Sequence, residues 1–193
     1  MDFYLIRHAD TDSQGAPDPY SVPLSERGRE QAHALGERSR QWDLQMLCVS
    51  TTRRNMDTAD PISAALPDLV RWDLEELEDL SLDDLNYEPG ASHLVATWTE
   101  DQLERGLISL WGRLTAACVR IQVYAQTYGL ERIGIVASER VLNLMIAYWL
   151  GQDWRLWQQG RLSFAESPVC RVTLAEGAPA VIAWLGEATD RCA

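Results

Sequence analysis

Residues 3–10 read Phe-Tyr-Leu-Ile-Arg-His-Ala-Asp, and the rest of the chain is interpreted outward from them. The four apolar residues in a row predict a short strand covered on both faces, because a buried parallel strand shows a continuous apolar run. Arg7 and His8 follow this strand directly, at the edge where open α/β sheets bind their ligands. A bidentate cation beside a nucleophilic imidazole suits a phosphate group. On its own the dipeptide is better explained as two surface residues, so the hypothesis depends on the rest of the chain.

The composition predicts one globular domain over residues 1–193, with 46% hydrophobic residues. The chain has no run of eighteen apolar residues, which excludes a membrane-spanning helix. It opens into a strand, without the basic region and cleavage site of a signal peptide. The four cysteines are scattered and form no CxxC pair, which favours free thiols and a cytoplasmic location; they are Cys48, Cys118, Cys170 and Cys192.

The charge pattern excludes some classes of partner. The net charge is −12, and all seventeen basic residues are arginines. Non-specific binding to nucleic acid or to an anionic membrane needs a basic surface, so neither is expected. No metal and no organic cofactor is expected either, because the sequence has no Cys/His cluster with ligand spacing, no GxGxxG and no Walker motif.

Strand-like and helix-like segments alternate along the chain. Expected strands or extended segments cover residues 3–6, 46–49, 70–72, 133–137, 169–174 and 180–185. Four helices are expected. The first follows Ser25, the second covers residues 53–65 and is kinked or divided by Pro61, the third begins before Leu107 and ends near Gly129, and the fourth covers residues 140–150. This alternation predicts an α/β fold, a three-layer α/β/α sandwich around a mostly parallel sheet.

Three strand ends carry polar residues that can converge on one pocket. Arg7 and His8 follow the first strand, residues 50–54 follow the second, and residues 137–140 follow the strand at 133. Arg53 and Arg54 also lie where a strand passes into a helix, a place that favours an anion.

With these motifs the chain resembles the histidine phosphatase superfamily, which has the phosphoglycerate mutase-like fold. Residues 5–9 match its strand-Arg-His-Gly motif with Ala9 in place of glycine, and residues 24–32 match Leu-Ser/Thr-x-x-Gly-x-x-Gln-Ala. Residues 50–59 match Ser-Pro-x-x-Arg-Ala-x-x-Thr-Ala more loosely, with a one-residue offset that identifies Arg54, not Arg53, as the phosphate-binding arginine. The proline is missing there, and Asn55 replaces the usual alanine.

The resemblance implies a two-step phosphoryl transfer. His8 would attack phosphorus and carry a phosphohistidine, while Arg7 and Arg54 hold the equatorial oxygens. A carboxylic acid would protonate the leaving oxygen and then help water to attack. The family's Leu-x-Glu motif is best matched at residues 74–76, so Glu76 is the expected acid, with Glu75 and Glu78 as alternatives. Seven of the twelve residues from 73 to 84 are acidic, and most are expected on a solvated surface.

The fourth motif is where the sequence departs from the family. The pattern Val-Ser-His-Gly appears as Val-Ala-Ser-Glu at residues 136–139, so Ser138 takes the place of the second histidine and Glu139 that of the glycine. Ser138 can donate a hydrogen bond to phosphate but brings no positive charge; losing one such donor costs about 3–4 kcal/mol. Glu139 either repels the phosphate or pairs with Arg140 or Arg54.

No other histidine is placed to substitute for the missing one. His33 is expected on the first helix, and His93 in a loop that has a small chance of covering the pocket mouth.

Two functions from different classes fit this pattern. The first is an attenuated or atypical phosphomonoesterase acting on a phosphorylated small molecule or phosphoprotein. The second is a catalytically inactive pseudo-phosphatase that binds a phosphorylated ligand or partner. A mutase is less favoured, because the acidic stretch is a poor neighbour for a substrate with several negative charges. The eight tryptophans suggest either a homodimer surface or core packing, with four in the C-terminal half: Trp149, Trp154, Trp157 and Trp184.

Overall fold

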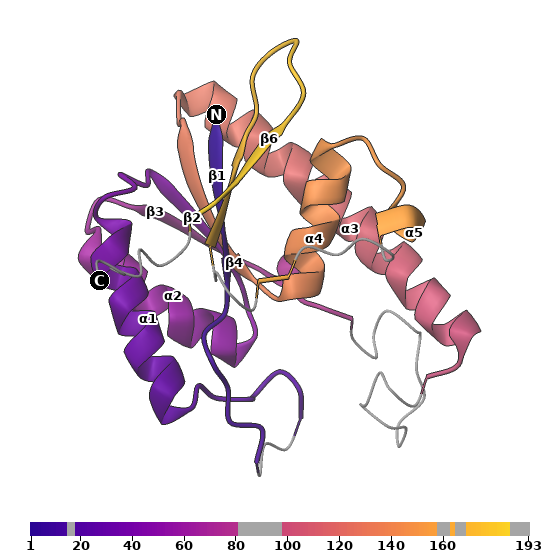
Figure 1. The fold of residues 1–193 in the computed structure, drawn as a ribbon, viewed down its shortest axis with the longest axis horizontal. Coiled ribbons are helices and arrows are strands. Elements are labelled where there is room, and N and C mark those ends of the chain that lie inside the picture. The colour runs from indigo at the N-terminus through magenta and orange to yellow at the C-terminus, as the bar shows by residue number, and fades with distance from the viewer. Residues whose placement is uncertain (15–17, 81–97, 158–162, 165–168, 186–193) are drawn as a thin grey trace, which may run out of the picture.

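The computed structural model describes residues 1–14, 18–80, 98–157, 163–164 and 169–185, and these form an α/β sandwich around one six-stranded sheet (Figure 1). The strand order is β3-β2-β4-β1-β5-β6. The strands are β1 (Asp2–Arg7), β2 (Met46–Ser50), β3 (Val70–Leu74), β4 (Arg132–Ala137), β5 (Val169–Thr173) and β6 (Val181–Trp184).

Four neighbouring strands, β3, β2, β4 and β1, run parallel, and β5 joins β1 in the antiparallel sense. The register pairs Arg7 with Ala137 and Ser50 with Leu74, so these residues end their strands at the same edge of the sheet. The backbone N–H of His8 continues this ladder by donating to the carbonyl of Ala137. The mostly parallel sandwich expected from the sequence is therefore confirmed, and the expected strand ends converge.

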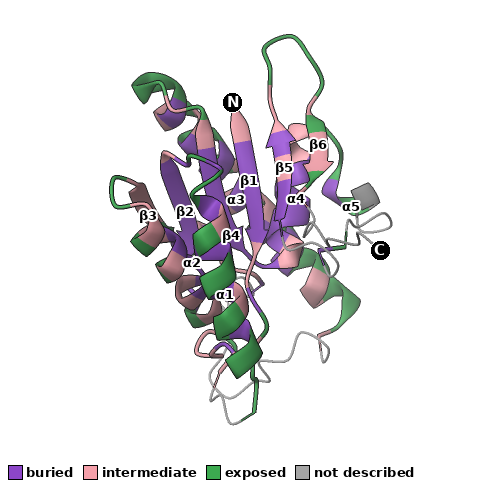
Figure 2. Ribbon diagram, turned by 60° about the vertical axis from the view of Figure 1, so that its left-hand side comes forward, coloured by how far each residue is buried: buried purple, intermediate pink, exposed green. Residues whose placement is uncertain are grey.

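Two helices cover each face of the sheet (Figures 1 and 2). Helices α1 (Glu26–Ser39) and α2 (Arg53–Ala65) pack together on one face; α3 (Glu100–Tyr128) and α4 (Glu139–Trp149) cover the other, and α4 contacts the short α5 (Trp154–Trp157). The side chains of β1 alternate between two hydrophobic clusters: Phe3 and Leu5 face α3 and α4, and Tyr4 and Ile6 face α1 and α2. Burial on both faces explains the continuous apolar run.

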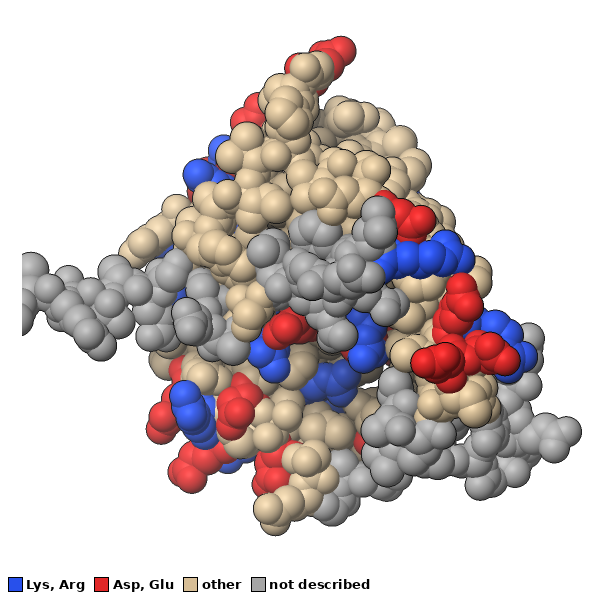
Figure 3. Space-filling view, turned by 45° about the vertical axis from the view of Figure 1, so that its right-hand side comes forward, with Lys and Arg blue, Asp and Glu red and all other residues tan. Residues whose placement is uncertain are grey.

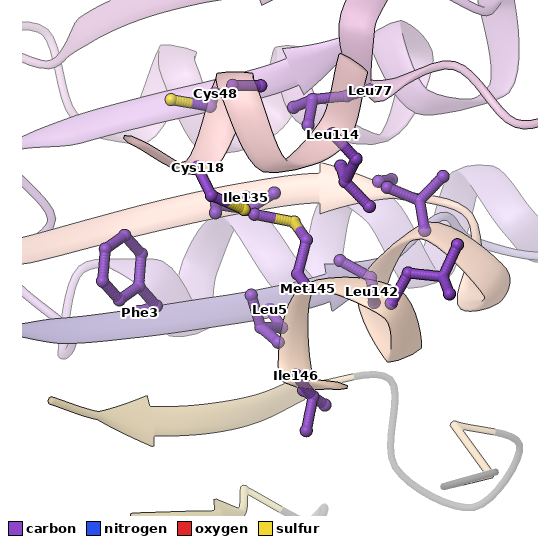
Figure 4. Packing of buried hydrophobic residues seen from close by; sticks show 14 of the residues in the cluster. Phe3, Leu5, Cys48, Leu77, Leu114, Cys118, Ile135, Leu142, Met145 and Ile146 are labelled. Atoms are coloured by element: carbon purple, nitrogen blue, oxygen red, sulfur yellow. The ribbon is translucent and has the colours of Figure 1, made fainter. Parts of the chain in front are cut away.

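Helix α4, which follows β4, is held in place by the hydrophobic core that it shares with α3 (Figure 4). Leu142, Met145 and Ile146 of α4 are fully buried in the same cluster as Leu114 and Cys118 of α3. Because α4 begins at Glu139, directly after β4, this packing fixes the start of the helix at the strand-end edge of the sheet.

Of the two effects expected of Pro61, a kink or a division of the helix, the division does not occur: α2 continues as one helix from Arg53 to Ala65. The helix survives because α1 packs closely against it at this point. A Cβ added to Gly36 of α1 would lie 2.7 Å from the carbonyl oxygen of Pro61. Tertiary packing therefore offsets the hydrogen bond that proline removes.

Two short elements were not anticipated, the 3₁₀ turn η1 (Glu75–Leu77) and α5. Among the described residues, no helix is long and apolar enough to span a membrane. Cys48, Cys118 and Cys170 are buried free thiols, and burial raises the pKa of Cys118 to about 12. The acidic residues after position 80, the loop with His93, and Cys192 lie outside the described residues.

Candidate active site

His8 stands at the end of β1 as a neutral imidazole with one nitrogen available. Its Nδ1 lies 2.9 Å from the carbonyl oxygen of Ala9. A carbonyl can only accept, so Nδ1 carries the proton and Nε2 keeps its lone pair. Burial lowers the pKa of His8 to about 4, helped by the charges of Arg54 and Arg7 and opposed by the bond to Ala9 and by Asp79. Near neutral pH the ring is therefore uncharged, the form needed by a nucleophile.

The loop after His8 is fixed by the second sequence motif. Ser25 begins α1 as its N-cap, accepting from the N–H of Gly28, and its hydroxyl donates to the carboxylate of Asp10 at 2.6 Å. The side chain of Gln31 accepts from the N–H of Asp10 at 2.9 Å. The Ser and Gln of this motif therefore hold the backbone that follows His8.

Gly28 belongs to the same arrangement because the chain passes directly over it. A Cβ at this position would lie 1.9 Å from the carbonyl oxygen of Asp10, a distance no side chain tolerates. The glycine of the motif is thus required for close approach of two backbone segments.

The third motif supplies a second anchor. The hydroxyl of Thr58 accepts from the N–H of Ala9 at 3.0 Å and donates to the carbonyl of Arg54 at 2.6 Å. One side chain therefore joins the backbone beside His8 to the first turn of α2, where Arg54 lies.

Arg54, rather than Arg53, faces His8. Burial lowers the pKa of Arg54, with Asp79 and Glu78 opposing, and Arg54 in turn lowers the pKa of His8. Its Nη1 donates to the carbonyl of Pro19 at 2.6 Å. The side chain of Arg53 is 58% exposed and lies 3.6 Å from Asp57 on the surface of α2. The backbone N–H of Arg53 donates to the carbonyl of Tyr20, so it is not available to an anion.

Arg7 is engaged by a carboxylate of the chain itself. Its Nη1 lies 3.0 Å from Oε2 of Glu139, the first residue of α4, and both side chains are about one-third exposed. The sequence suggested Arg140 or Arg54 as the partner of Glu139, but the structure pairs Glu139 with Arg7. In this structure Glu139 therefore contacts the cation that the family resemblance assigns to phosphate.

Ser138, in the place of the second histidine, caps α4 and contacts Asp79. Its hydroxyl donates to Oδ2 of Asp79 at 2.8 Å and accepts a longer bond from the N–H of Val141. The other oxygen of Asp79 accepts from Nη1 of Arg140 at 2.7 Å. The single proton of Ser138 is thus already used, and a phosphate would have to displace Asp79 to receive it.

The three candidate acids point in different directions. Glu76 forms an ion pair with Arg120 of α3 at 2.7 Å, and Glu75 is exposed. Glu78 accepts a hydrogen bond from the hydroxyl of Thr51, which follows β2. Of the three, Glu78 alone appears among the charges that raise the pKa of Arg54.

Arg113 of α3 fixes the segment that carries these acids. Its Nη1 donates to the carbonyls of Glu75, Glu76 and Glu78, and its Nη2 donates to that of Asp79. One guanidinium therefore binds four backbone carbonyls in η1 and directly after it. This clamp holds Glu78 and Asp79 at the strand-end edge.

The structure brings His8, Arg7, Arg54 and Ser138 to one edge of the sheet, and Glu76 faces α3 beside it. Figure 3 shows arginine and acidic side chains intermixed around a hollow in the lower half of one face, the half toward which the parallel strands run. Sequence reasoning assigned no role to three residues of this network, Thr51, Asp79 and Arg113, and named Arg140 only as a possible partner of Glu139. Asp79 and Arg113 lie in none of the quoted family motifs, and Thr51 stands where the third motif has its proline, so only the fold reveals their contacts.

Among the described residues, no three His, Cys, Asp or Glu side chains lie together as a metal site.

Comparison with known proteins gives a family and a fold. The sequence model of the histidine phosphatase superfamily (branch 1) matches residues 3–185. The structure of α-ribazole phosphatase from Shigella flexneri is similar, with a TM-score of 0.73, 21% identity and 96% of each chain covered. A mycobacterial glucosyl-3-phosphoglycerate phosphatase gives a TM-score of 0.69, 18% identity, and covers 96% of this chain and 97% of its own. The protein histidine phosphatase SixA, complexed with tungstate, gives 0.62, with 16% identity and 95% of each chain covered. No curated protein matches the chain. At these identities the structures show the fold alone.

Proposed function

We propose that this chain, which belongs to the histidine phosphatase superfamily (branch 1), hydrolyses phosphomonoesters through a phosphohistidine at His8. The observation that carries the proposal is the state of His8: neutral, oriented by the Ala9 carbonyl, and flanked by Arg7 and Arg54. An isolated surface histidine would have none of these features.

In the first step the lone pair of His8 Nε2 forms a bond to phosphorus, and the bond from phosphorus to the leaving oxygen breaks. Arg7 and Arg54 hold the equatorial oxygens, where negative charge accumulates in the transition state. The carbonyl of Ala9 stabilises the positive ring that results, because it accepts from Nδ1–H. The leaving alcohol takes a proton from an acid. In the second step the same group, now a carboxylate, removes a proton from water as the water oxygen bonds to phosphorus and the bond from phosphorus to Nε2 breaks, which releases inorganic phosphate and regenerates His8.

For the acid we propose Glu78 ahead of Glu76. Glu78 accepts a hydrogen bond from Thr51 at the end of β2, and its charge raises the pKa of Arg54, whereas Glu76 forms an ion pair with Arg120 on α3. A proton donor has to reach the leaving oxygen within hydrogen-bonding distance, so position decides before acidity. Glu76 remains the better match to the family's sequence motif, and a Glu76 variant is therefore the control for a Glu78 variant.

Turnover of an aryl phosphate by the parent and by a His8→Ala variant tests the activity. The variant is expected to lose at least about a thousandfold in kcat/KM, since removing a nucleophile eliminates the covalent route. Equal rates in the two proteins, with both correctly folded, would contradict the proposal. A weak parental rate fits an attenuated enzyme, because Ser138 brings no positive charge and its proton is donated to Asp79.

A pseudo-phosphatase that binds a phosphorylated ligand or partner is the second candidate, favoured by the ion pair between Arg7 and Glu139. It predicts that phosphate raises the Tm of the parent, that Arg7→Ala and Arg54→Ala abolish this shift, and that no phosphomonoester is turned over. Millimolar phosphate without effect on Tm excludes the phosphate-binding version.

Three further points remain proposals. They are the substrate class (a phosphorylated small molecule or a phosphoprotein), the cytoplasmic location and the homodimer. Trp149 stacks on Phe3 at 4.4 Å and Trp154 is buried, so these two side chains pack within the protein. Trp184 is 40% exposed, and its edge packs against Phe164. Sedimentation at several protein concentrations tests the homodimer.

A further inference from the structure

Three carboxylates of this chain border the proposed phosphate position. Glu139 contacts Arg7, Asp79 contacts Arg140 and Ser138, and Glu78 contacts Thr51. The charges of Asp79 and Glu78 also raise the pKa of Arg54, and the charge of Asp79 raises that of His8, so both carboxylates lie near the proposed reacting centre.

These carboxylates balance the cations at this edge of the sheet before any substrate arrives. Arg7 is paired with Glu139 and Arg140 with Asp79, while Glu78 and Asp79 lie close enough to Arg54 to raise its pKa, and His8 is neutral. A dianionic phosphate therefore approaches arginines that already face carboxylates of the chain. Uncompensated negative charge in a half-buried site is strongly unfavourable, because nearby like charges repel and water is partly excluded.

Glu139 is the carboxylate in direct contact with an arginine proposed to bind phosphate. A phosphoryl oxygen that binds Nη1 of Arg7 competes with Glu139 for it, so the 3.0 Å ion pair opens when the substrate takes that nitrogen. Glu139 remains at the first position of α4, where the helix N-terminus favours a negative charge, and its side chain is 32% exposed. Displaced from Arg7, this carboxylate lacks its cation.

A positive group on the substrate would restore the lost ion pair. We infer, on the basis of the proposed phosphatase activity, that Glu139 selects phosphomonoesters whose leaving alcohol carries a positively charged group close to the phosphate. The phosphate takes Arg7 and Arg54, and the cation takes Glu139. A substrate without that cation leaves Glu139 unpaired beside the phosphate and is disfavoured. The glycine that the family motif places at this position would make no such distinction.

Phosphocholine and 3,3-dimethylbutyl phosphate provide the test, because the two esters have nearly the same shape and differ by the charge of one atom. We expect the parent to prefer phosphocholine in kcat/KM by about tenfold or more, the scale of one ion pair at a partly exposed site. In Glu139→Gln the value for phosphocholine should fall and that for the neutral ester should rise, bringing the ratio to about one. Glu37→Gln, which alters an exposed ion pair with Arg40 on α1, is the matched control and should keep the parental ratio.

The outcomes separate this inference from the activity on which it rests. Turnover of both esters and of an aryl phosphate with no preference in the parent overturns the selection by Glu139 and leaves the phosphatase intact. A preference that Glu139→Gln does not change also overturns it, because another group would then bind the cation. Loss of turnover on all three esters to the level of His8→Ala overturns both proposals.

Discussion

On the β1 side of the site, defined by residues 7–10, 25–31 and 54–58, backbone groups and short polar side chains make most of the contacts. Ser25, Gln31 and Thr58 each bind a backbone or carboxylate group next to His8. On the α4 side, defined by residues 75–80 and 138–140, the contacts are ion pairs and charged hydrogen bonds, such as those of Asp79 with Ser138 and Arg140.

The β1 side follows the family motifs, and its contacts hold the backbone beside His8, the proposed nucleophile. The α4 side departs from the motif, and its charges compensate one another within the chain. In the proposed mechanism the first side would set whether His8 can react, and the second would set how strongly phosphate is held and which substrates are preferred.

Converting the α4 side to the family motif should give the largest effect. Ser138→His with Glu139→Gly adds a donor to the phosphoryl group and releases Arg7 from its ion pair. We expect kcat/KM for an aryl phosphate to rise by about a hundredfold or more, the scale of one transition-state donor. An unchanged rate in a folded double variant would mean that the α4 side is not what limits catalysis.

Separating the two candidate acids should give the next largest effect. Glu78→Gln is expected to reduce kcat by about a hundredfold on an alkyl phosphate, whose poor leaving group needs a proton, and by less on an aryl phosphate with a good one. Glu76→Gln should stay within about twofold of the parent, because it removes a partly exposed ion pair with Arg120. The reverse ranking of the two variants would return the acid to Glu76.

Adding one methyl group to the β1 side should cost stability. Gly28→Ala places a Cβ 1.9 Å from the carbonyl of Asp10, so the backbone must shift. We expect a loss of about 2–4 kcal/mol in the free energy of unfolding, measured by urea denaturation. Gly112→Ala on the exposed surface of α3 is the control: nothing lies within 4 Å of its new Cβ, and it should stabilise the helix by up to about 1 kcal/mol. Equal effects at both positions would refute the close approach.

The pH dependence of stability should show a smaller effect from His8. Its pKa is lowered to about 4 in the folded protein, against about 6.5 in an unfolded chain. As the pH falls from about 6.5 to 4, the unfolded state takes up a proton that the folded state refuses, so this contribution to stability decreases; above that window it is constant. We expect a loss of up to about 2 kcal/mol after allowance for the partial exposure of the ring. The His8→Asn variant should lack this part of the slope, and a parallel profile would contradict the assignment.

The sequence was sufficient for the sandwich because its strands and helices carry their periodicity locally. The apolar run at residues 3–6 and the stripe of α3 depend on neighbours a few positions away, as does the cap at Gly129, where φ is 67°. The sequence left open whether Pro61 would kink or divide its helix, because the packing against α1 that keeps the helix continuous is not encoded in its own segment.

The candidate site was predicted only as far as its motifs extend. His8, Arg7, Arg54 and Ser138 lie in or beside recognisable patterns, and the structure brings them to one edge. Asp79 and Arg113 do not, because they act through contacts over more than thirty residues of sequence. In an acidic run the sequence motif favoured Glu76, but the direction of each carboxylate depends on η1 and on the guanidinium of Arg113.

The most direct test of the account is whether His8 becomes phosphorylated. The parent is mixed with an aryl phosphate, denatured within milliseconds at alkaline pH to preserve phosphohistidine, and digested for mass spectrometry. One phosphoryl group is expected on the peptide that contains His8; it should be absent from His8→Ala and lost on longer incubation as substrate is exhausted. Phosphate binding that shifts the Tm while His8 stays unmodified during turnover conditions would contradict it.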